Sequence, residues 1–158
     1  MNAHDTAAGT PDPELPFLTI GDLGILRDVE ETADGVVVTI TPTYSGCPAM
    51  REITADLTGR LTAAGYSRVE LRTRLAPPWS SDWITADGRA KLEQAGIAPP
   101  GPRRTGAVPL TLGRRPAVRC PACGADDTVE LAHFGATACK ALHRCRACAE
   151  PFEAVKAI

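Results

Sequence analysis

Two pairs of cysteines near the C-terminal end constrain the fold of this chain more than any other feature. They are Cys120-Pro-Ala-Cys123 and Cys145-Arg-Ala-Cys148, with 21 residues between the pairs. A tetrahedral ion such as Zn²⁺ takes four thiolates, and two tight C-x-x-C turns in a small β-structure can supply them. Gly124 follows the first pair, where the chain has to turn beneath a metal. The pattern predicts a zinc ribbon over residues 118–158, with four ligands: Cys120, Cys123, Cys145 and Cys148.

The predicted role of this zinc is structural. Four protein thiolates complete the tetrahedron and leave no open position for a catalytic water. An iron–sulfur centre on the same thiolates is the second interpretation. His133 and His143 lie between the two pairs, and we interpret them as surface or strand residues rather than as ligands.

Composition narrows the cellular setting and the partners. The first residues carry neither the basic nor the apolar region of a secretory signal, and no window is apolar enough for a membrane span, so we expect a cytoplasmic protein without membrane contact. In that reducing compartment, six cysteines indicate metal ligands or reactive thiols rather than disulfides. The net charge of −2 argues against nucleic acid as a partner.

The chain of 158 residues is long enough for one domain of ordinary size and a small second one. We expect a disordered tail over residues 1–11, because these residues are small and polar with Gly and Pro. A first domain follows over residues 12–97. Residues 98–117 are rich in Pro, Gly and Arg and predict a semi-rigid linker before the ribbon.

The pattern over residues 12–97 predicts an α+β domain with a small mixed sheet. Two strands around Ala33-Asp34-Gly35 indicate a hairpin, and a helix begins near Pro48 and ends at Gly65. The second strand, this helix and a third strand form a βαβ unit, in which the two strands run parallel. A short helix closes at Gly96. The predicted elements are strands 25–31, 36–41 and 69–75, the helix with apolar positions Met50, Ile53, Leu57, Leu61 and Ala64, and a helix over 85–95.

Cys47 lies between a predicted buried strand and the helix that opens with Pro48. The N–H groups and the positive dipole end of a helix N-terminus favour a thiolate, so we predict a lowered pKa for Cys47. This arrangement suits a nucleophile or a transient ligand for a soft metal; a capping residue without chemistry is the alternative. A cysteine hydrolase would also need a histidine base, and no histidine lies near Cys47 in the sequence.

Three further residues are candidates for function. Cys139 is either a small buried apolar residue or a reactive thiol beside Lys140, and the sequence does not decide between the two. Trp79 and Trp83 lie in a Pro-rich segment of an aromatic-poor chain. They either pack on the core of their own domain, which we favour for Trp79, or form a surface for a partner.

Several motifs together resemble a known family. The first part of the chain is similar to the iron–sulfur cluster assembly domain family that includes SufT. With the ribbon and its own motifs, residues 12–158 resemble the PaaD (or PaaJ) family of accessory subunits of the phenylacetyl-CoA 1,2-epoxidase system. The motifs are Asp12-Pro-Glu-Leu-Pro16, Asp22-Leu-Gly-Ile25, Thr43 with Gly46-Cys47-Pro48, Trp79 with Asp82-Trp83, Gly96-Ile-Ala-Pro-Pro100, Phe134-Gly-Ala-Thr-Ala-Cys-Lys140 and Glu150-Pro-Phe152.

The resemblance implies a role in phenylacetate catabolism, an aromatic-compound degradation pathway. Proteins of this kind help to mature or load metal centres, including iron–sulfur clusters, in the oxygenase and reductase subunits of the system. The family's reactive cysteine corresponds to Cys47, where iron or a cluster would bind transiently. The family often has a helix before its Asp-Pro-Glu motif, whereas residues 1–11 look too short and too rich in Gly, Pro and Thr for one. A homodimer is an open alternative for the assembly.

Two other function classes compete with an accessory subunit. A zinc-ribbon module that binds nucleic acid would draw on Arg103-Arg104 and Arg114-Arg115, although the overall acidity opposes it. A thiol enzyme would use Cys47, but it lacks the histidine base. The sequence also has no Glu-x-x-His pair of a di-iron site, no dinucleotide fingerprint and no phosphate-binding loop, so we expect a protein that is not itself an enzyme.

Overall fold

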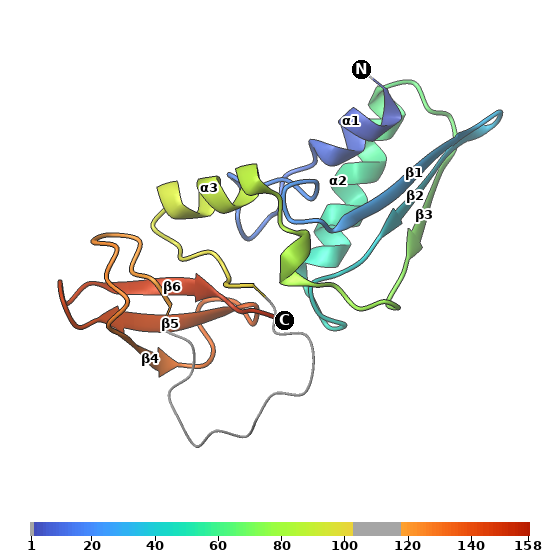
Figure 1. Cartoon of the computed structure of the whole chain (residues 1–158). Helices are drawn as coiled ribbons and strands as arrows, with labels where there is room; N and C mark the ends of the chain where they lie inside the picture. Colours follow the sequence, from blue (N-terminus) through green and yellow to red (C-terminus); the bar gives the residue numbers. More distant parts are fainter. Residues whose placement is uncertain (1, 103–117) are drawn as a thin grey trace. The chain divides into compact units, whose positions relative to one another are not determined.

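The computed structural model describes residues 2–102 and 118–158 (Figure 1). The chain divides into two compact units, Met1–Gly88 and Arg89–Ile158. The domain boundary predicted after residue 97 therefore falls inside the second unit, and most of the predicted linker, residues 103–117, lies outside the described residues. In the two described stretches, no helix has the length and apolar character needed to cross a bilayer.

The N-terminal unit is built on a three-stranded mixed sheet of order β1-β2-β3. Its strands are β1 (Leu26–Thr32), β2 (Gly35–Ile40) and β3 (Val69–Thr73). β1 and β2 are antiparallel and joined at Ala33-Asp34, and β2 and β3 are parallel. This topology confirms the predicted hairpin, βαβ unit and small mixed sheet.

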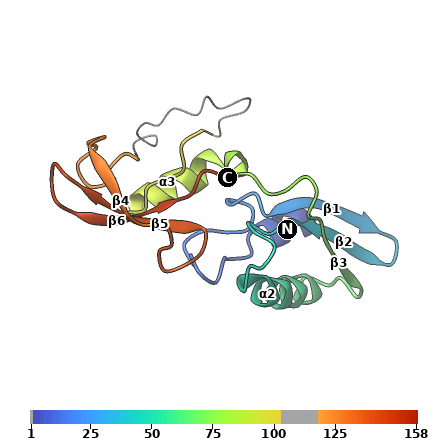
Figure 2. The ribbon, with the colours of Figure 1, turned by 90° about the horizontal axis from the view of Figure 1, so that it is seen from below.

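The helix α2 (Ala49–Ala63) connects β2 to β3 and lies along one face of the sheet (Figure 2). It buries one stripe of its surface, at Ala49, Ile53, Leu57 and Leu61, and the sheet buries Val36, Val38 and Ile40. The predicted apolar face is largely confirmed, except that Ala64 lies beyond the helix and is exposed. Gly65 follows with a φ of +102°, the conformation that lets glycine end a helix.

The first residues correct an expectation. The expected disordered tail over residues 1–11 is not found in its described part, residues 2–11: a helix, α1 (Ala3–Ala8), begins at Asn2, whose side chain accepts the N–H of Asp5 at 2.8 Å. Ala3 and Ala7 are fully buried, and the Ala3 N–H donates to the Glu31 carboxylate on β1 at 3.1 Å. Alanines let the helix approach closely, but they give almost no amphipathic signal, which is why the sequence pattern did not reveal it.

A 3₁₀ turn, η1 (Ser81–Trp83), and the helix α3 (Ala86–Gln94) follow the sheet. α3 confirms the predicted short helix over residues 85–95. Gly96, just beyond its end, has a φ of +74°, as a helix-ending glycine requires.

The C-terminal unit contains a second sheet, antiparallel and of order β4-β5-β6. Its strands are β4 (Thr128–Ala132), β5 (Lys140–Cys145) and β6 (Pro151–Val155). Ala98 pairs with the edge of β6 through two main-chain hydrogen bonds. Its N–H donates to the Glu153 carbonyl at 2.9 Å, and its carbonyl accepts the Val155 N–H at 3.0 Å. The predicted linker therefore does not begin at residue 98. The core of the ribbon consists of Ala98, Cys120, Cys145, Phe152 and Ala154.

Candidate functional site

The four paired cysteines meet at one point of the C-terminal unit. Their sulfur atoms all lie within 4.8 Å of one another, with 3.8 Å between Cys120 and Cys148 and 3.6 Å between Cys123 and Cys145. Zn–S bonds of about 2.3 Å in a tetrahedron place the sulfurs about 3.8 Å apart. The donor set therefore fits one zinc ion and leaves no position for a reacting ligand.

Two matched turns carry the cysteines. Gly124 and Ala149, the residues that follow the second cysteine of each pair, both have left-handed backbones, with φ of +75° and +63°. In each turn a main-chain N–H is hydrogen-bonded to the second cysteine of the pair: Ala125 to Cys123 and Glu150 to Cys148. These hydrogen bonds lower the pKa of the two thiols, but neighbouring sulfurs and burial outweigh them, so the pKa of both Cys123 and Cys148 is raised. The turn at Gly124 was predicted; the matching turn at Ala149, where glycine is missing, was not.

The four thiols of the cluster differ in how readily they lose a proton. Hydrogen bonding from the Cys148 N–H, with a further contribution from Ala147, lowers the pKa of Cys145 to about 7. Despite the Glu150 N–H, burial and the neighbouring sulfurs raise the pKa of Cys148 to about 12. Like charges this close cannot all persist, so a cation that binds here must displace protons from most of the cluster.

Neither histidine of the ribbon joins this cluster. His143 is buried and stacks on Phe152, with 5.7 Å between the ring centroids. His133 is exposed and lies 3.4 Å from the Glu130 carboxylate. Both positions agree with the interpretation of these histidines as strand and surface residues.

Cys47 lies in the turn between β2 and α2, as predicted, and is half-buried. Its main-chain N–H donates to the Tyr44 carbonyl at 3.1 Å, and its carbonyl accepts the Met50 N–H at 3.3 Å. The thiol is hydrogen-bonded by the Ala49 N–H and by Thr43. The helix N-terminus thus contacts the sulfur, as the sequence indicated.

The predicted lowering of the Cys47 pKa is nevertheless wrong. Burial raises the pKa of this thiol, and the nearby carboxylates of Glu14 and Asp12 raise it further. The Ala49 N–H and Thr43 lower it, but by less. The sequence did not reveal that the Asp12-Pro-Glu14 segment reaches this turn, so the two negative charges were missing from the prediction.

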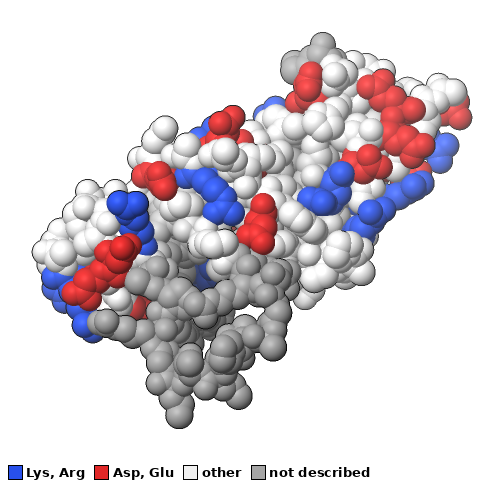
Figure 3. Space-filling view, viewed as in Figure 1, with Lys and Arg blue, Asp and Glu red and all other residues white. Residues whose placement is uncertain are grey.

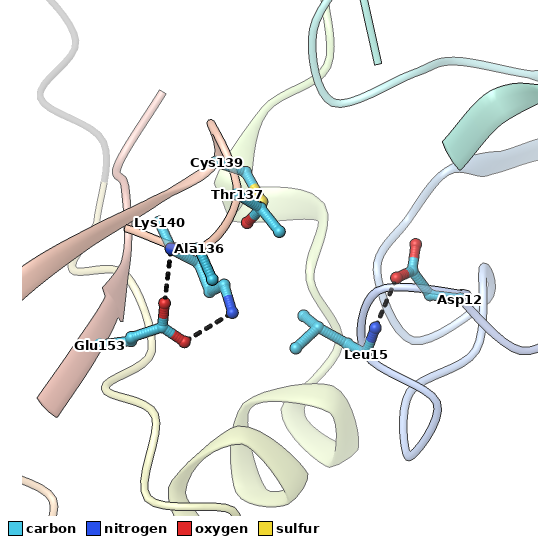
Figure 4. A network of polar contacts seen from close by, with 7 residues as sticks. All are labelled: Asp12, Leu15, Ala136, Thr137, Cys139, Lys140 and Glu153. Atoms are coloured by element: carbon cyan, nitrogen blue, oxygen red, sulfur yellow. Dashed lines mark hydrogen bonds and ion pairs between the residues drawn. The ribbon is translucent and has the colours of Figure 1, made fainter. Parts of the chain in front are cut away.

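Asp12 is held in place by its own turn. Its Oδ1 accepts the N–H group of Glu14 at 2.9 Å. The same oxygen accepts the N–H group of Leu15 at 2.8 Å (Figure 4). The N-terminal unit thus gathers a thiol and two carboxylates from segments more than thirty residues apart in the sequence. The two carboxylates act on the thiol through their charge, whereas among the described residues only the sulfur atoms of the four paired cysteines lie close enough together to hold a metal ion.

The two tryptophans contact a single turn of their own unit. Trp79 is only 4% exposed, and its indole N–H donates to the Leu23 carbonyl at 2.9 Å. Gly24, with a φ of +66°, lies against Trp83 so closely that a Cβ at Gly24 would come within 2.6 Å of it. The half-buried Trp83 ring carries the Arg27 guanidinium 3.6 Å from its centroid. The burial of Trp79 supports the core interpretation, whereas Trp83 is only half-buried.

Cys139 ends the loop between β4 and β5, where it is half-buried and its sulfur lies 3.1 Å from the Thr137 hydroxyl (Figure 4). The ammonium group of the neighbouring Lys140 is bound to Glu153 at 2.6 Å. Glu153 also accepts the Ala136 N–H at 3.0 Å, so this buried ion pair braces the loop. The charge of Lys140 is thus directed to Glu153, which weakens the interpretation of Cys139 as a lysine-activated thiol.

Two family models match the chain. The model described as PaaD zinc beta ribbon domain matches residues 104–156, and the model described as iron–sulfur cluster assembly protein matches residues 9–70. The second match contains Asp12, Glu14 and Cys47, and the first contains all four paired cysteines.

Two individual proteins extend this comparison. The chain is 44% identical over 149 residues to an Escherichia coli (strain K12) protein described as a putative subunit of 1,2-phenylacetyl-CoA epoxidase, covering 94% of this chain and 87% of that protein. A crystal structure of a domain of unknown function, DUF59, from Bacillus anthracis is 27% identical. It covers 57% of this chain and 87% of that domain, with a TM-score of 0.53.

Proposed function

Because the chain belongs to the PaaD family of 1,2-phenylacetyl-CoA epoxidase subunits, we propose that it is an accessory subunit which assists metal-centre maturation in that system. Its partners are the oxygenase and reductase subunits, whose iron centres or iron–sulfur clusters it helps to load. The chain itself performs no epoxidation in this proposal, and the metal that it handles is cargo.

The grouping at Cys47 is the observation that carries the proposal. The thiol lies in a half-buried turn with the carboxylates of Asp12 and Glu14 close enough to raise its pKa. A protonated thiol resists oxidation and alkylation, because the thiolate is the reactive form. An incoming metal ion displaces the proton and is attracted by the two carboxylates. The Cys47 thiol is therefore unreactive until a metal ion arrives, and the site is suited to brief metal binding.

The zinc cluster has a different part in this proposal. Four cysteines close the coordination sphere, so the ion that they hold stabilises the ribbon and does not exchange with cargo. The zinc keeps the β4–β5 loop and its neighbours folded, and the Cys47 turn handles the transferred metal.

Substitution of Cys47 tests this division of roles. Cys47→Ser is nearly isosteric, so the purified protein should keep its thermal stability and its zinc. In cells we expect poor growth on phenylacetate and low iron content in the co-purified oxygenase and reductase subunits. Cys139→Ser is the matched control, because serine can keep the contact with Thr137, and it should leave growth and iron content normal.

Two results would contradict the proposal. Normal growth and full iron loading with Cys47→Ser would remove this residue from the maturation role. Loss of iron loading with Cys139→Ser alone would transfer the role to the ribbon loop.

Nucleic-acid binding gains no support from the described ribbon. Its five basic residues are matched by five acidic ones over residues 118–158, so it carries no excess of positive charge. The arginines at 103–104 and 114–115, on which that alternative depends, lie outside the described residues.

A further inference from the structure

Each cysteine pair of the ribbon has one buried and one exposed member. Cys120 and Cys145, the first cysteines of the two pairs, are buried, whereas Cys123 and Cys148, the second cysteines, are exposed. Solvent therefore reaches the cluster from the side of Cys123 and Cys148. A small reagent in solution can approach this side while the other two ligands stay covered.

Each exposed cysteine contacts a buried cysteine of the opposite pair. The Cys123 sulfur lies 3.6 Å from that of Cys145, and the Cys148 sulfur lies 3.8 Å from that of Cys120. Cysteines that respond to oxidants are typically accessible thiolates beside a second thiol, which resolves the oxidised sulfur as a disulfide. In both contacts, the resolving thiol is already beside the exposed one.

The two cysteines outside the cluster are less suited to oxidation. All four cluster cysteines must be thiolates to bind zinc, and the thiolate is the form that attacks an oxidant. Cys47 and Cys139 are both half-buried and lie outside the cluster. Burial and two nearby carboxylates also favour the protonated form of Cys47 by raising its pKa. Exposure and thiolate character are therefore combined only at Cys123 and Cys148 among the cysteines of the chain.

We propose that Cys123 and Cys148 are oxidation sites, at which hydrogen peroxide converts the zinc-bound ribbon into a disulfide-linked and unfolded form without metal. The exposed sulfur is attacked, and the buried sulfur in contact with it closes the disulfide. The N-terminal unit has its own aliphatic core and stays folded. This inference is independent of the proposed maturation role.

The chemistry consumes one peroxide for each disulfide. The exposed thiolate attacks one oxygen of H₂O₂, so that an S–O bond forms, the O–O bond breaks and hydroxide leaves. The buried thiolate then attacks the sulfenic acid, forms the S–S bond and displaces a second hydroxide. The two sulfurs lose two electrons, which the peroxide takes up, and protons from water neutralise both hydroxides. Two thiolates remain, too few to fill the tetrahedron of a structural zinc site.

Hydrogen peroxide suits this surface because it is small and uncharged. Acidic and basic side chains lie next to one another on the face of the ribbon seen in Figure 3, and residues 118–158 carry five of each kind. Such a mixed surface does not steer charged reagents from a distance. Exposure and thiolate character therefore decide which cysteine reacts.

Titration of the full zinc-loaded chain with hydrogen peroxide tests the proposal. A chelating dye reports the release of zinc, and differential alkylation followed by peptide mass mapping identifies each oxidised cysteine. We expect zinc release together with a Cys123–Cys145 or a Cys120–Cys148 disulfide, before Cys47 or Cys139 is oxidised. A dithiol reductant with added zinc should then restore the amide spectrum of residues 118–158.

A double variant separates metal binding from oxidation. Cys123→His combined with Cys148→His leaves two cysteines and two histidines, a donor set that structural zinc sites use. It removes both exposed thiolates, so peroxide should release its zinc at least about tenfold more slowly than from the wild-type chain. Cys139→Ser is the matched control: it removes a thiol outside the cluster and should leave the rate of zinc release unchanged.

Three results would overturn the proposal. Oxidation of Cys47 or Cys139 ahead of the cluster would show that exposure does not direct the reaction. Early disulfides within the pairs, such as Cys120–Cys123, would exclude the contacts between pairs as the resolving step. Equal rates of zinc release from the double variant and the wild-type chain would exclude Cys123 and Cys148 as the sites of attack. If the double variant binds no zinc, the order of oxidation in the wild-type chain decides.

Discussion

At the scale of the residue, Cys47 is controlled by its electrostatic surroundings more than by the helix that follows it. The Ala49 N–H stabilises the thiolate, but burial and two carboxylates oppose it more strongly. A helix N-terminus acts only over its first turn, whereas a carboxylate in a partly buried site acts over several ångströms. The protonated thiol is therefore the resting form.

Removal of one negative charge should lower the pKa of Cys47. We expect Glu14→Gln to move the pH profile of iodoacetamide alkylation at Cys47 to lower pH and to raise the rate at neutral pH a few-fold, measured with Cys139→Ser as background. Glu52→Gln is the matched control, since Glu52 lies in the first turn of α2 but does not shift the pKa of Cys47. An unchanged profile with Glu14→Gln would show that burial alone sets the pKa.

Ala149 offers a second test at this scale. Its φ of +63° is left-handed, a conformation that costs an L-residue roughly 1 kcal/mol and glycine almost nothing. Ala149→Gly should therefore stabilise the zinc-loaded ribbon by up to about 1 kcal/mol, measured by denaturant unfolding. Ala147→Gly, in the same turn but without a left-handed backbone, should destabilise it slightly. Equal effects of the two variants would contradict the strain argument.

At the scale of the element, the sequence predicted what regular patterns encode. The β-branched run of β2, the apolar stripe of α2 and the glycines that end α2 and α3 are local signals. They placed the βαβ unit and the short helix after it correctly. α1 was missed because its buried residues are alanines, and the approach of Asp12 to Cys47 was missed because it depends on tertiary packing. The paired cysteines were predicted from spacing alone, since the metal dictates their geometry.

The brace of the β4–β5 loop also depends on tertiary contacts. Glu153 on β6 binds the buried Lys140 ammonium and the Ala136 N–H, and Gly135 passes so close that a Cβ would lie 2.8 Å from the carboxylate. Lys156 completes the brace by donating to the Ala138 carbonyl at 2.9 Å. The motif that resembles the PaaD family in this loop thus has a structural explanation.

Loss of the Glu153 charge should loosen this loop. Burial opposes the charged form, but Lys140 and the Ala136 N–H hold the pKa of Glu153 below its usual value. Its contribution to stability is therefore present above the unfolded-state pKa and is lost as the pH falls through the folded-state pKa. We expect Glu153→Gln to destabilise the ribbon by about 2 kcal/mol at pH 7, because it leaves the Lys140 charge buried without a partner.

The measurement is denaturant unfolding of the zinc-loaded protein at pH 7, with amide exchange of residues 134–139 as the local readout. Glu150→Gln, on the same segment but outside the brace, is the matched control. A loss of stability no larger for Glu153→Gln than for Glu150→Gln would contradict the ion-pair explanation.

At the scale of the whole molecule, the two units differ in what stabilises them. The N-terminal unit buries large aliphatic side chains on both α2 and the sheet, including Leu57, Leu61, Val38 and Ile40. Over the described residues 118–158, the buried apolar side chains larger than alanine and cysteine are Phe152 and Val155, and two of the metal-binding cysteines lie in the same core. A unit this small with so few apolar groups depends on its metal for folding.

Metal removal should therefore unfold one unit and spare the other. We expect chelation, or Cys120→Ser, to collapse the dispersion of amide signals from residues 118–158 while the signals of residues 12–88 keep theirs. Because the four thiols must lose their protons to bind zinc, lowering the pH should weaken zinc binding and produce the same selective loss. Cys139→Ser, a cysteine outside the cluster, should leave both units folded and zinc bound. A ribbon that keeps its native amide spectrum after chelation would show that Phe152 and its neighbours suffice as a core, and the cluster would then need another explanation.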